Sequence, residues 1–85
     1  MAYTVTFAPV AERQLARLDP PIRRRVSTAI NALAVDPRPP GVKKLEGEEN
    51  LWRIRVGDYR FVYQIHDRNL IVLIVRIAHR GDVYR

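Results

Sequence analysis

In the segment Leu51–Val56, arginine alternates with apolar residues, which is typical of a strand with one cationic side. Neighbouring side chains on a strand point to opposite faces, so Arg53 and Arg55 share one face and the apolar residues share the other. The guanidinium group keeps its charge at physiological pH and forks onto phosphate or carboxylate oxygens. The spacing therefore predicts a strand whose cationic face binds an anion.

The dipeptide Gly57-Asp58 predicts a two-residue hairpin turn directly after this strand. With that turn, Arg55 lies opposite Arg60, and Arg60 joins the cationic face. If Asp67–Asn69 is a three-residue turn, Arg76 of the next strand also comes opposite Arg60. Three-residue turns often carry a bulge, so the register of this second hairpin stays open.

Like charges directly opposite each other on neighbouring strands destabilise a sheet by a few tenths to about 1 kcal/mol. The acidic residues of these hairpins, Asp58 and Asp67, both lie at turns, so we expect no counter-charge on the face itself. We interpret such a face as a binding surface for an incoming anion. The alternative is a face whose arginines extend into water, in a chain whose 13 arginines reflect GC-rich codons.

The apolar spacing elsewhere predicts the elements that position this face. We expect strands at 2–7, 43–45, 51–56, 59–66 and 70–78. Apolar stripes at 10–18 and 22–33 predict two helices, the first with Pro9 in its first turn and the second ending near Asp36-Pro37. Asp19-Pro20 separates the two helices, and the Pro-rich stretch Asp36–Val42 predicts a loop. The order β-α-α-β-β-β predicts an α+β fold, a small antiparallel sheet with an N-terminal helical hairpin packed on one face.

The 85 residues are enough for one small domain, residues 1–85, and the net charge of +6 favours a polyanionic partner. The absence of cysteine excludes disulfides and Cys-ligated zinc, and no carboxylate cluster accompanies the two histidines, so we expect neither a metal nor another cofactor. The longest apolar run, Leu70–Val75, is too short to span a membrane, and Met1–Phe7 is typical of a strand rather than a signal sequence. We therefore expect a cytoplasmic protein with no membrane partner.

Two motifs stand in order along the chain: KKLEGEENLWRIRVGDYRFVYQI at Lys43–Ile65 and HRGDVY at His79–Tyr84. Together, at this spacing, they resemble the RelE branch of the RelE/ParE superfamily of bacterial toxins, and the resemblance covers nearly all of the chain. It implies a RelE-like fold and the toxin of a type II toxin–antitoxin pair. RelE-type toxins cut messenger RNA in the ribosomal A site and so stop translation.

The resemblance also implies roles for single residues by motif position. Arg53 and Arg55 match the family's basic pair on the strand, and Arg60 matches the arginine after the hairpin turn. Arg80 and Tyr84 match the arginine and the tyrosine of the terminal motif. The best-known members carry lysine at the positions of Arg53 and Arg55, and arginine rarely surrenders its proton, which argues against a general base at either position.

The implied reaction is a metal-independent transesterification, in which a 2′-OH attacks the adjacent phosphorus and the 5′-oxygen leaves. We expect Arg60 and Arg80 to stabilise the phosphorane charge and Tyr84 to stack on a base. Histidine is the side chain most often used for proton transfer, so His79 is expected either to act as an acid or base or to be an exposed strand-end residue. The expected RNA-binding residues are Arg53, Arg55, Arg76, Lys43 and Lys44.

Other residues leave alternatives open. A carboxylate of Glu46, Glu48 or Glu49 could act as the base, or the three could form only a solvated loop. Trp52 lies on the apolar side of its strand and is expected in the core rather than as a stacking platform. His66 precedes a turn and is expected to be structural or merely exposed.

The resemblance implies a RelB-like antitoxin whose flexible acidic segment neutralises the arginines. It also implies that the toxin–antitoxin complex regulates its own operator DNA through the antitoxin. The ribosome and messenger RNA are the other expected partners. Two alternatives stay open: a ParE-like inhibitor of DNA gyrase, and a non-toxic basic module that binds RNA or an acidic protein.

Overall fold

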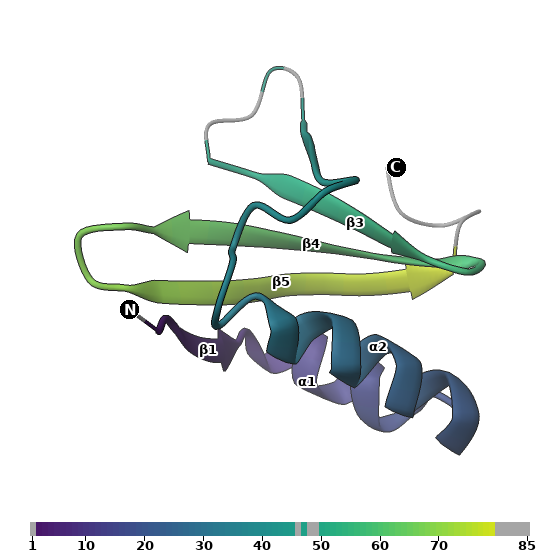
Figure 1. The fold of residues 1–85 in the computed structure, drawn as a ribbon. Coiled ribbons are helices and arrows are strands. Elements are labelled where there is room, and N and C mark those ends of the chain that lie inside the picture. The colour runs from purple at the N-terminus through teal and green to yellow at the C-terminus, as the bar shows by residue number, and fades with distance from the viewer. Residues whose placement is uncertain (1, 46, 48–49, 80–85) are drawn as a thin grey trace.

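The computed structural model describes residues 2–45, 47 and 50–79, which form five strands and two helices (Figure 1). In chain order they are β1 (Thr4–Phe7), α1 (Pro9–Ala16), α2 (Pro20–Ala32), β2 (Lys43–Lys44), β3 (Trp52–Val56), β4 (Tyr59–His66) and β5 (Ile71–His79). Every element lies where the sequence predicts one, but α2 ends at Ala32, earlier than the predicted end near Asp36-Pro37.

The strands form one sheet in the order β1-β5-β4-β3-β2. Strands β2 to β5 pair antiparallel with their neighbours, as predicted, whereas β1 pairs with β5 in parallel. The α+β class is confirmed, and the antiparallel sheet expected from the sequence is corrected to a mixed one. A parallel pair needs a long connection between its strands, and the two helices and three strands between β1 and β5 supply it.

The two helices lie on one face of the sheet and cover its apolar side chains (Figure 1). Phe61 and Tyr63 of β4 are fully buried there against Val26 and Ile30 of α2, which are also fully buried. Trp52 of β3 is half-buried and packs against this core, as predicted. The strand period of two therefore sends the aromatic residues toward the helices and their neighbours to the opposite face.

Proline opens both helices, at Pro9 and Pro20, where the first turn needs no N–H donor. The Arg23 side chain of α2 donates to the carbonyl oxygens of Ala16 and Leu18, each at 3.3 Å. The end of a helix leaves such carbonyls without an intrahelical partner, so these bonds join the end of α1 to the start of α2. Neither helix of the described chain is long and apolar enough to cross a membrane.

The β3–β4 hairpin has the predicted register, with Arg55 opposite Arg60. The β4–β5 hairpin differs from prediction, because its turn holds a fourth residue, Leu70, in left-handed backbone with φ 54°. The β4–β5 register shifts by one further residue between Val62 and Tyr63. As a result, Arg76 lies opposite Val62 instead of Arg60. The predicted partner was wrong but the predicted face was right, because two one-residue offsets return the side chain to the same side.

The side chain of Gln14 completes the edge of β5 where β1 has ended. β1 stops at Phe7, opposite Ile74, so no described strand pairs with the later part of β5 on that side. The Oε1 atom of Gln14 accepts a hydrogen bond from the N–H of Ile77 at 2.7 Å. This bond satisfies a backbone donor that would otherwise lack a partner and anchors α1 to the sheet.

A buried hydrogen bond ties the Pro-rich loop to the core. The Tyr63 hydroxyl donates to the carbonyl oxygen of Pro37 at 2.7 Å, and Tyr63 is fully buried. Burial raises the pKa of Tyr63, so its hydroxyl stays protonated and able to donate. The loop that leads from α2 to β2 is thereby fixed against β4.

We predict that Tyr63→Phe destabilises the protein by about 1–2 kcal/mol, because the mutation removes the donor and leaves the buried Pro37 carbonyl unsatisfied. Chemical denaturation of the purified protein measures the difference. Tyr59→Phe is the control, since Tyr59 is only half-buried, and its hydroxyl donates to no residue that the structure describes. Equal losses in the two variants would contradict the role of the Tyr63–Pro37 bond.

Candidate nucleic-acid interface

Four arginines share the sheet face opposite the helices, as the alternation predicts. Arg53 and Arg55 come from β3, Arg60 from β4 and Arg76 from β5, and the cross-strand register places all four on the same side. We call these four residues the arginine face. None of the described strand residues on this side of the sheet is acidic, so the face concentrates positive charge without a carboxylate from its own strands.

Packing and hydrogen bonding restrict the side chains of the arginine face. Val62 lies between Arg53 and Arg76 in the register and is only 6% exposed. The aliphatic part of an arginine side chain commonly covers apolar surface of this kind. The Nε atom of Arg60 is buried. The Nε atom of Arg55 donates to the Gly57 carbonyl at 3.1 Å, which holds this guanidinium at the β3–β4 turn. Restricted side chains lose less entropy when they bind a ligand.

The two lysines of β2 point to opposite sides. Lys43 lies opposite Arg53 and extends the arginine face to the sheet edge, whereas Lys44 lies opposite Trp52 on the other side. The Lys44 ammonium sits 5.7 Å from the centroid of the Trp52 ring, and the Arg38 guanidinium sits 5.1 Å from it. The indole is therefore flanked by two cations. Lys44 lies on the side of the sheet away from the arginine face, and its role in RNA binding stays a prediction.

The His79 side chain also departs from the expected cluster. His79 lies opposite Tyr59, whose ring belongs to the helix side of the sheet, and the two rings meet edge to face at 5.3 Å. The imidazole is exposed at the end of β5. Because opposite residues share a face, the structure places His79 on the side away from Arg60 and Arg76.

Several candidate residues lie outside the described part of the chain. Arg80 and Tyr84 of the terminal motif belong to this group, as do the carboxylates at Glu46, Glu48 and Glu49. The roles assigned to them therefore stay predictions.

The described face is suited to binding and stabilising negative charge rather than to moving protons. His66 is on the same side of the sheet, and its Nε2 lies 2.9 Å from Oε1 of Gln64. His66 lies six positions after Arg60 on β4, which is about 20 Å along a strand. Among the described residues, no three His, Asp or Glu side chains gather in a way that could hold a metal ion.

An ion-pair network at the other end of the sheet was not predicted from the sequence. The Arg38 guanidinium donates to both carboxylate oxygens of Asp67, at 3.3 and 3.0 Å, and the Tyr3 hydroxyl donates to Oδ1 at 2.6 Å. The network joins the N-terminal segment, the Pro-rich loop and the β4–β5 turn. The network forms only between residues that lie far apart in the sequence, so no local pattern could have indicated it.

The network shifts the pKa values of its members in opposite directions. The hydrogen bonds from Arg38 and then Tyr3 favour the ionised carboxylate and lower the pKa of Asp67. The same carboxylate accepts the Tyr3 proton in a hydrogen bond and raises the pKa of Tyr3.

Comparisons with known proteins give matches along nearly the whole chain. Residues 5–84 match the family described as ParE toxin of type II toxin-antitoxin system, parDE. Toxin RelG of Mycobacterium tuberculosis is 36% identical over 86 residues, which cover 100% of this chain and 99% of RelG.

Two solved structures show the same fold in similar chains. The archaeal RelE-RelB complex from Pyrococcus horikoshii OT3 matches with a TM-score of 0.83 at 30% identity, over 98% of this chain and 100% of that chain. The toxin-antitoxin complex RelBE2 from Mycobacterium tuberculosis matches with a TM-score of 0.80 at 35% identity, over 96% of this chain and 95% of that chain. The similarity in fold and sequence thus agrees with the motif resemblance.

We predict that Asp67→Asn lowers the thermal midpoint at neutral pH and that this difference narrows in acid. Because folding lowers the pKa of Asp67, its contribution to stability is present above the ordinary carboxyl pKa of about 3.9 and is lost as the pH falls through the lower folded value. Thermal unfolding of both proteins across this pH range measures the effect. Asp19→Asn is the matched control, because Asp19 makes no side-chain cap bond. A difference that does not change with pH would contradict the prediction.

Proposed function

We propose a ribosome-dependent endoribonuclease activity for this chain, which belongs to the RelE/ParE superfamily of toxins of type II toxin–antitoxin systems. The proposed substrate is translated messenger RNA, and its cleavage stops translation. The arginine face is the observation that carries the proposal, because four guanidinium groups without an acidic strand neighbour suit a phosphodiester backbone. Arg53, Arg55 and Arg60 also stand at the positions of the family's basic residues.

In the proposed reaction the RNA 2′-OH attacks the adjacent phosphorus and the bond to the 5′-oxygen breaks. Arg60, whose Nε is buried, is proposed to stabilise the charge of the phosphorane together with Arg80. Arg53, Arg55, Arg76 and Lys43 are proposed to hold the RNA backbone, and Tyr84 to stack on a base.

The described face offers few groups for proton transfer, and this shortage supports dependence on the ribosome. Arginine is a poor general base, and His79 lies on the other side of the sheet from Arg60. A ribosome that holds the RNA in an attack-ready geometry can replace part of the missing acid–base catalysis. We therefore propose that translated RNA is cut far faster than free RNA.

We further propose a RelB-like antitoxin as the inhibitory partner. The similar structures from Pyrococcus horikoshii and Mycobacterium tuberculosis are toxin–antitoxin complexes. The face that carries the arginines also presents the half-buried Ile71 and Leu73 of β5, so a segment that combines acidic and apolar residues would suit it. Control of operator DNA through this antitoxin belongs to the same proposal.

A second candidate function is inhibition of DNA gyrase. The family that matches residues 5–84 is described as the ParE toxin of the parDE system, which favours this reading. Induced expression separates the two functions: a gyrase inhibitor produces DNA breaks and an SOS response, whereas the proposed nuclease produces rapid loss of protein synthesis.

We expect controlled expression to generate new messenger RNA 5′ ends that cluster in frame within coding regions. Mapping of 5′ ends after induction measures this, and a reconstituted translation reaction with and without ribosomes measures the dependence. The control is the same transcript with its start codon removed, which is not translated. Efficient cutting of free RNA by the purified protein would contradict ribosome dependence.

We expect Arg60→Ala to lower the cleavage rate on ribosomes about 10²–10³-fold, because it removes a positioned donor to the phosphorane. Single-turnover cleavage on programmed ribosomes measures the rate. Arg13→Ala removes the same charge from the exposed surface of α1 and should leave the rate nearly unchanged. Circular dichroism establishes that both variants fold, and an unchanged rate in folded Arg60→Ala would refute the assigned role.

A further inference from the structure

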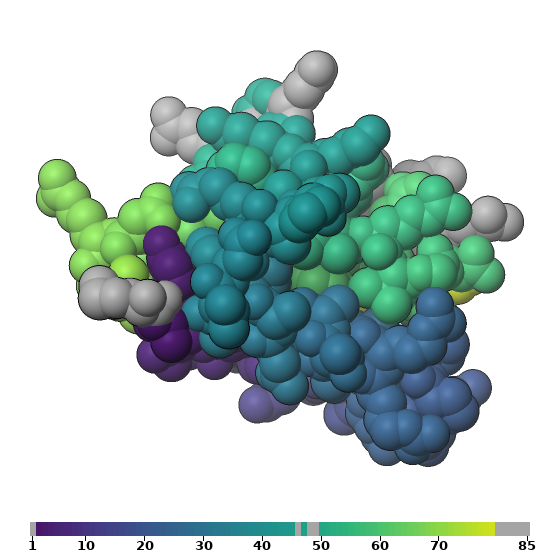
Figure 2. Space-filling view, viewed as in Figure 1, coloured from purple at the N-terminus to yellow at the C-terminus, as the bar shows by residue number. Residues whose placement is uncertain are grey.

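A second cationic site lies beside the β3–β4 turn, on the helix side of the molecule. Arg24, Arg25 and Thr28 of α2 and Val56 of β3 line an open cleft of about 330 Å³. Residues three and four apart on a helix are neighbours on its surface, so the α2 residues form one wall. Figure 2 shows the blue surface of α2 meeting the green surface of the β3–β4 hairpin at this end of the molecule. We call this site the α2 cleft.

The arginines of the α2 cleft have no structural task of the kind that Arg23 performs. Arg23 bonds to the end of α1, whereas Arg24 and Arg25 are exposed and their guanidinium groups form no hydrogen bond or ion pair with any residue that the structure describes. α2 contains no acidic residue, so no carboxylate one turn away on this helix offsets the two charges. Two neighbouring cations without a carboxylate on their own helix favour an anionic ligand.

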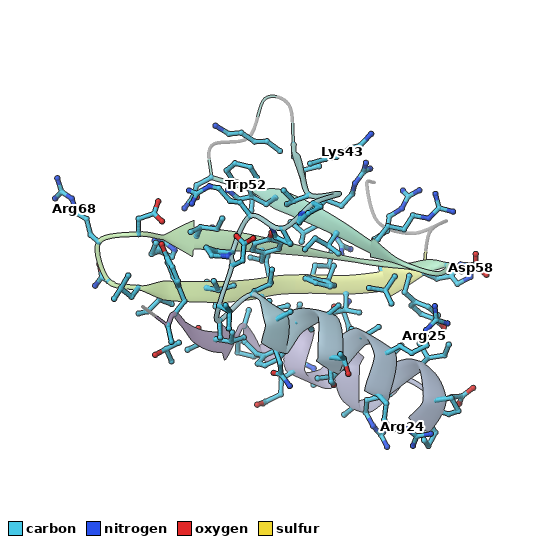
Figure 3. All side chains as sticks on the ribbon, viewed as in Figure 1. Arg24, Arg25, Lys43, Trp52, Asp58 and Arg68 are labelled. Atoms are coloured by element: carbon cyan, nitrogen blue, oxygen red, sulfur yellow. The ribbon has the colours of Figure 1, made fainter. Side chains whose placement is uncertain are left out.

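The turn connects the α2 cleft with the arginine face. A Cβ atom added at Gly57 would lie 3.4 Å from an Arg25 guanidinium nitrogen, so Arg25 reaches the turn from the helix side. Figure 3 shows Arg25 extending from α2 toward the hairpin end that carries Asp58. From the other side, Nε of Arg55 donates to the Gly57 carbonyl. Cations from both faces of the sheet thus meet at one glycine.

We propose that the α2 cleft binds the phosphodiester backbone of the same RNA strand that the arginine face binds, where that strand passes the β3–β4 turn. The inference rests on the proposed function and adds a second contact to it. Arg24 and Arg25 fork onto phosphate oxygens, and the site contacts no base, so it adds affinity without sequence preference. Because Gly57 has no side chain, the Arg25 guanidinium packs against the turn itself, so a phosphate that Arg25 binds would pass close to the turn.

Equilibrium binding of a short fluorescent 2′-O-methyl RNA tests the proposal, because this RNA has no 2′-OH to react and binding is separated from cleavage. The logarithm of the affinity is measured against the logarithm of the salt concentration. Each phosphate contact in single-stranded RNA contributes about 0.7 to the slope, so loss of two contacts in the Arg24→Ala/Arg25→Ala variant should flatten it by about 1.4. The Arg13→Ala/Arg17→Ala variant removes two exposed charges from α1 and is the matched control.

The outcomes separate the site from the overall function. A flatter slope in the α2 variant than in the control, with unchanged thermal unfolding, supports the site. Equal slopes in the two variants, with a flatter slope in Arg55→Ala/Arg76→Ala, would overturn the α2 cleft and leave the proposed function standing. Failure of the unmodified protein to bind the RNA would also overturn the α2 cleft, whereas the proposed function is overturned only if no cleavage occurs on ribosomes. The α2 variant could instead keep its affinity for the RNA and lose affinity for a peptide of alternating Glu and Leu. That result would assign the cleft to a protein ligand and overturn the proposal.

Discussion

The pairing of β3 with β4 fixes which side chains face the core and which face solvent, and the candidate site depends on this pairing. Ile54 lies opposite Phe61, and Trp52 lies opposite Tyr63, while Arg55 lies opposite Arg60. Full burial of an aromatic side chain contributes about 1.5–3 kcal/mol, more than the few tenths to 1 kcal/mol by which an opposed like-charge pair destabilises a sheet. A slip by one residue would exchange the two faces, so the core holds the arginines together against their repulsion.

The sequence predicts this hairpin well because its determinants are local. Two local features specify the register. They are the alternation of the five residues of β3 and the two-residue turn, whose first residue, Gly57, has a φ of 60°. The β4–β5 hairpin depends on less visible features, namely a left-handed Leu70 and a register shift near Val62. The face of Arg76 was predicted correctly only because these two deviations compensate each other.

The features that the sequence did not predict depend on contacts between distant segments. The parallel pairing of β1 with β5 leaves no mark in either strand, since the same alternation fits both directions. The positions of Lys44 and His79 depend on strand parity at element ends, where one residue decides the face. The Arg38–Asp67 pair joins a loop to a turn 29 residues away, so only the folded chain brings them together.

The positions of the arginines argue against codon composition as their only cause. Arg23 closes the helical hairpin and Arg38 pairs with Asp67, so each has a partner that explains it. The arginine face combines cations from three strands on a side where the described strands carry no acid. Burial of the opposite face restricts charged residues of either sign to this parity, but enrichment in arginine codons alone would not keep acidic residues out of it. Repulsion within this face falls when any polyanion binds, so RNA and an acidic antitoxin would draw on the same source of affinity and would exclude each other there.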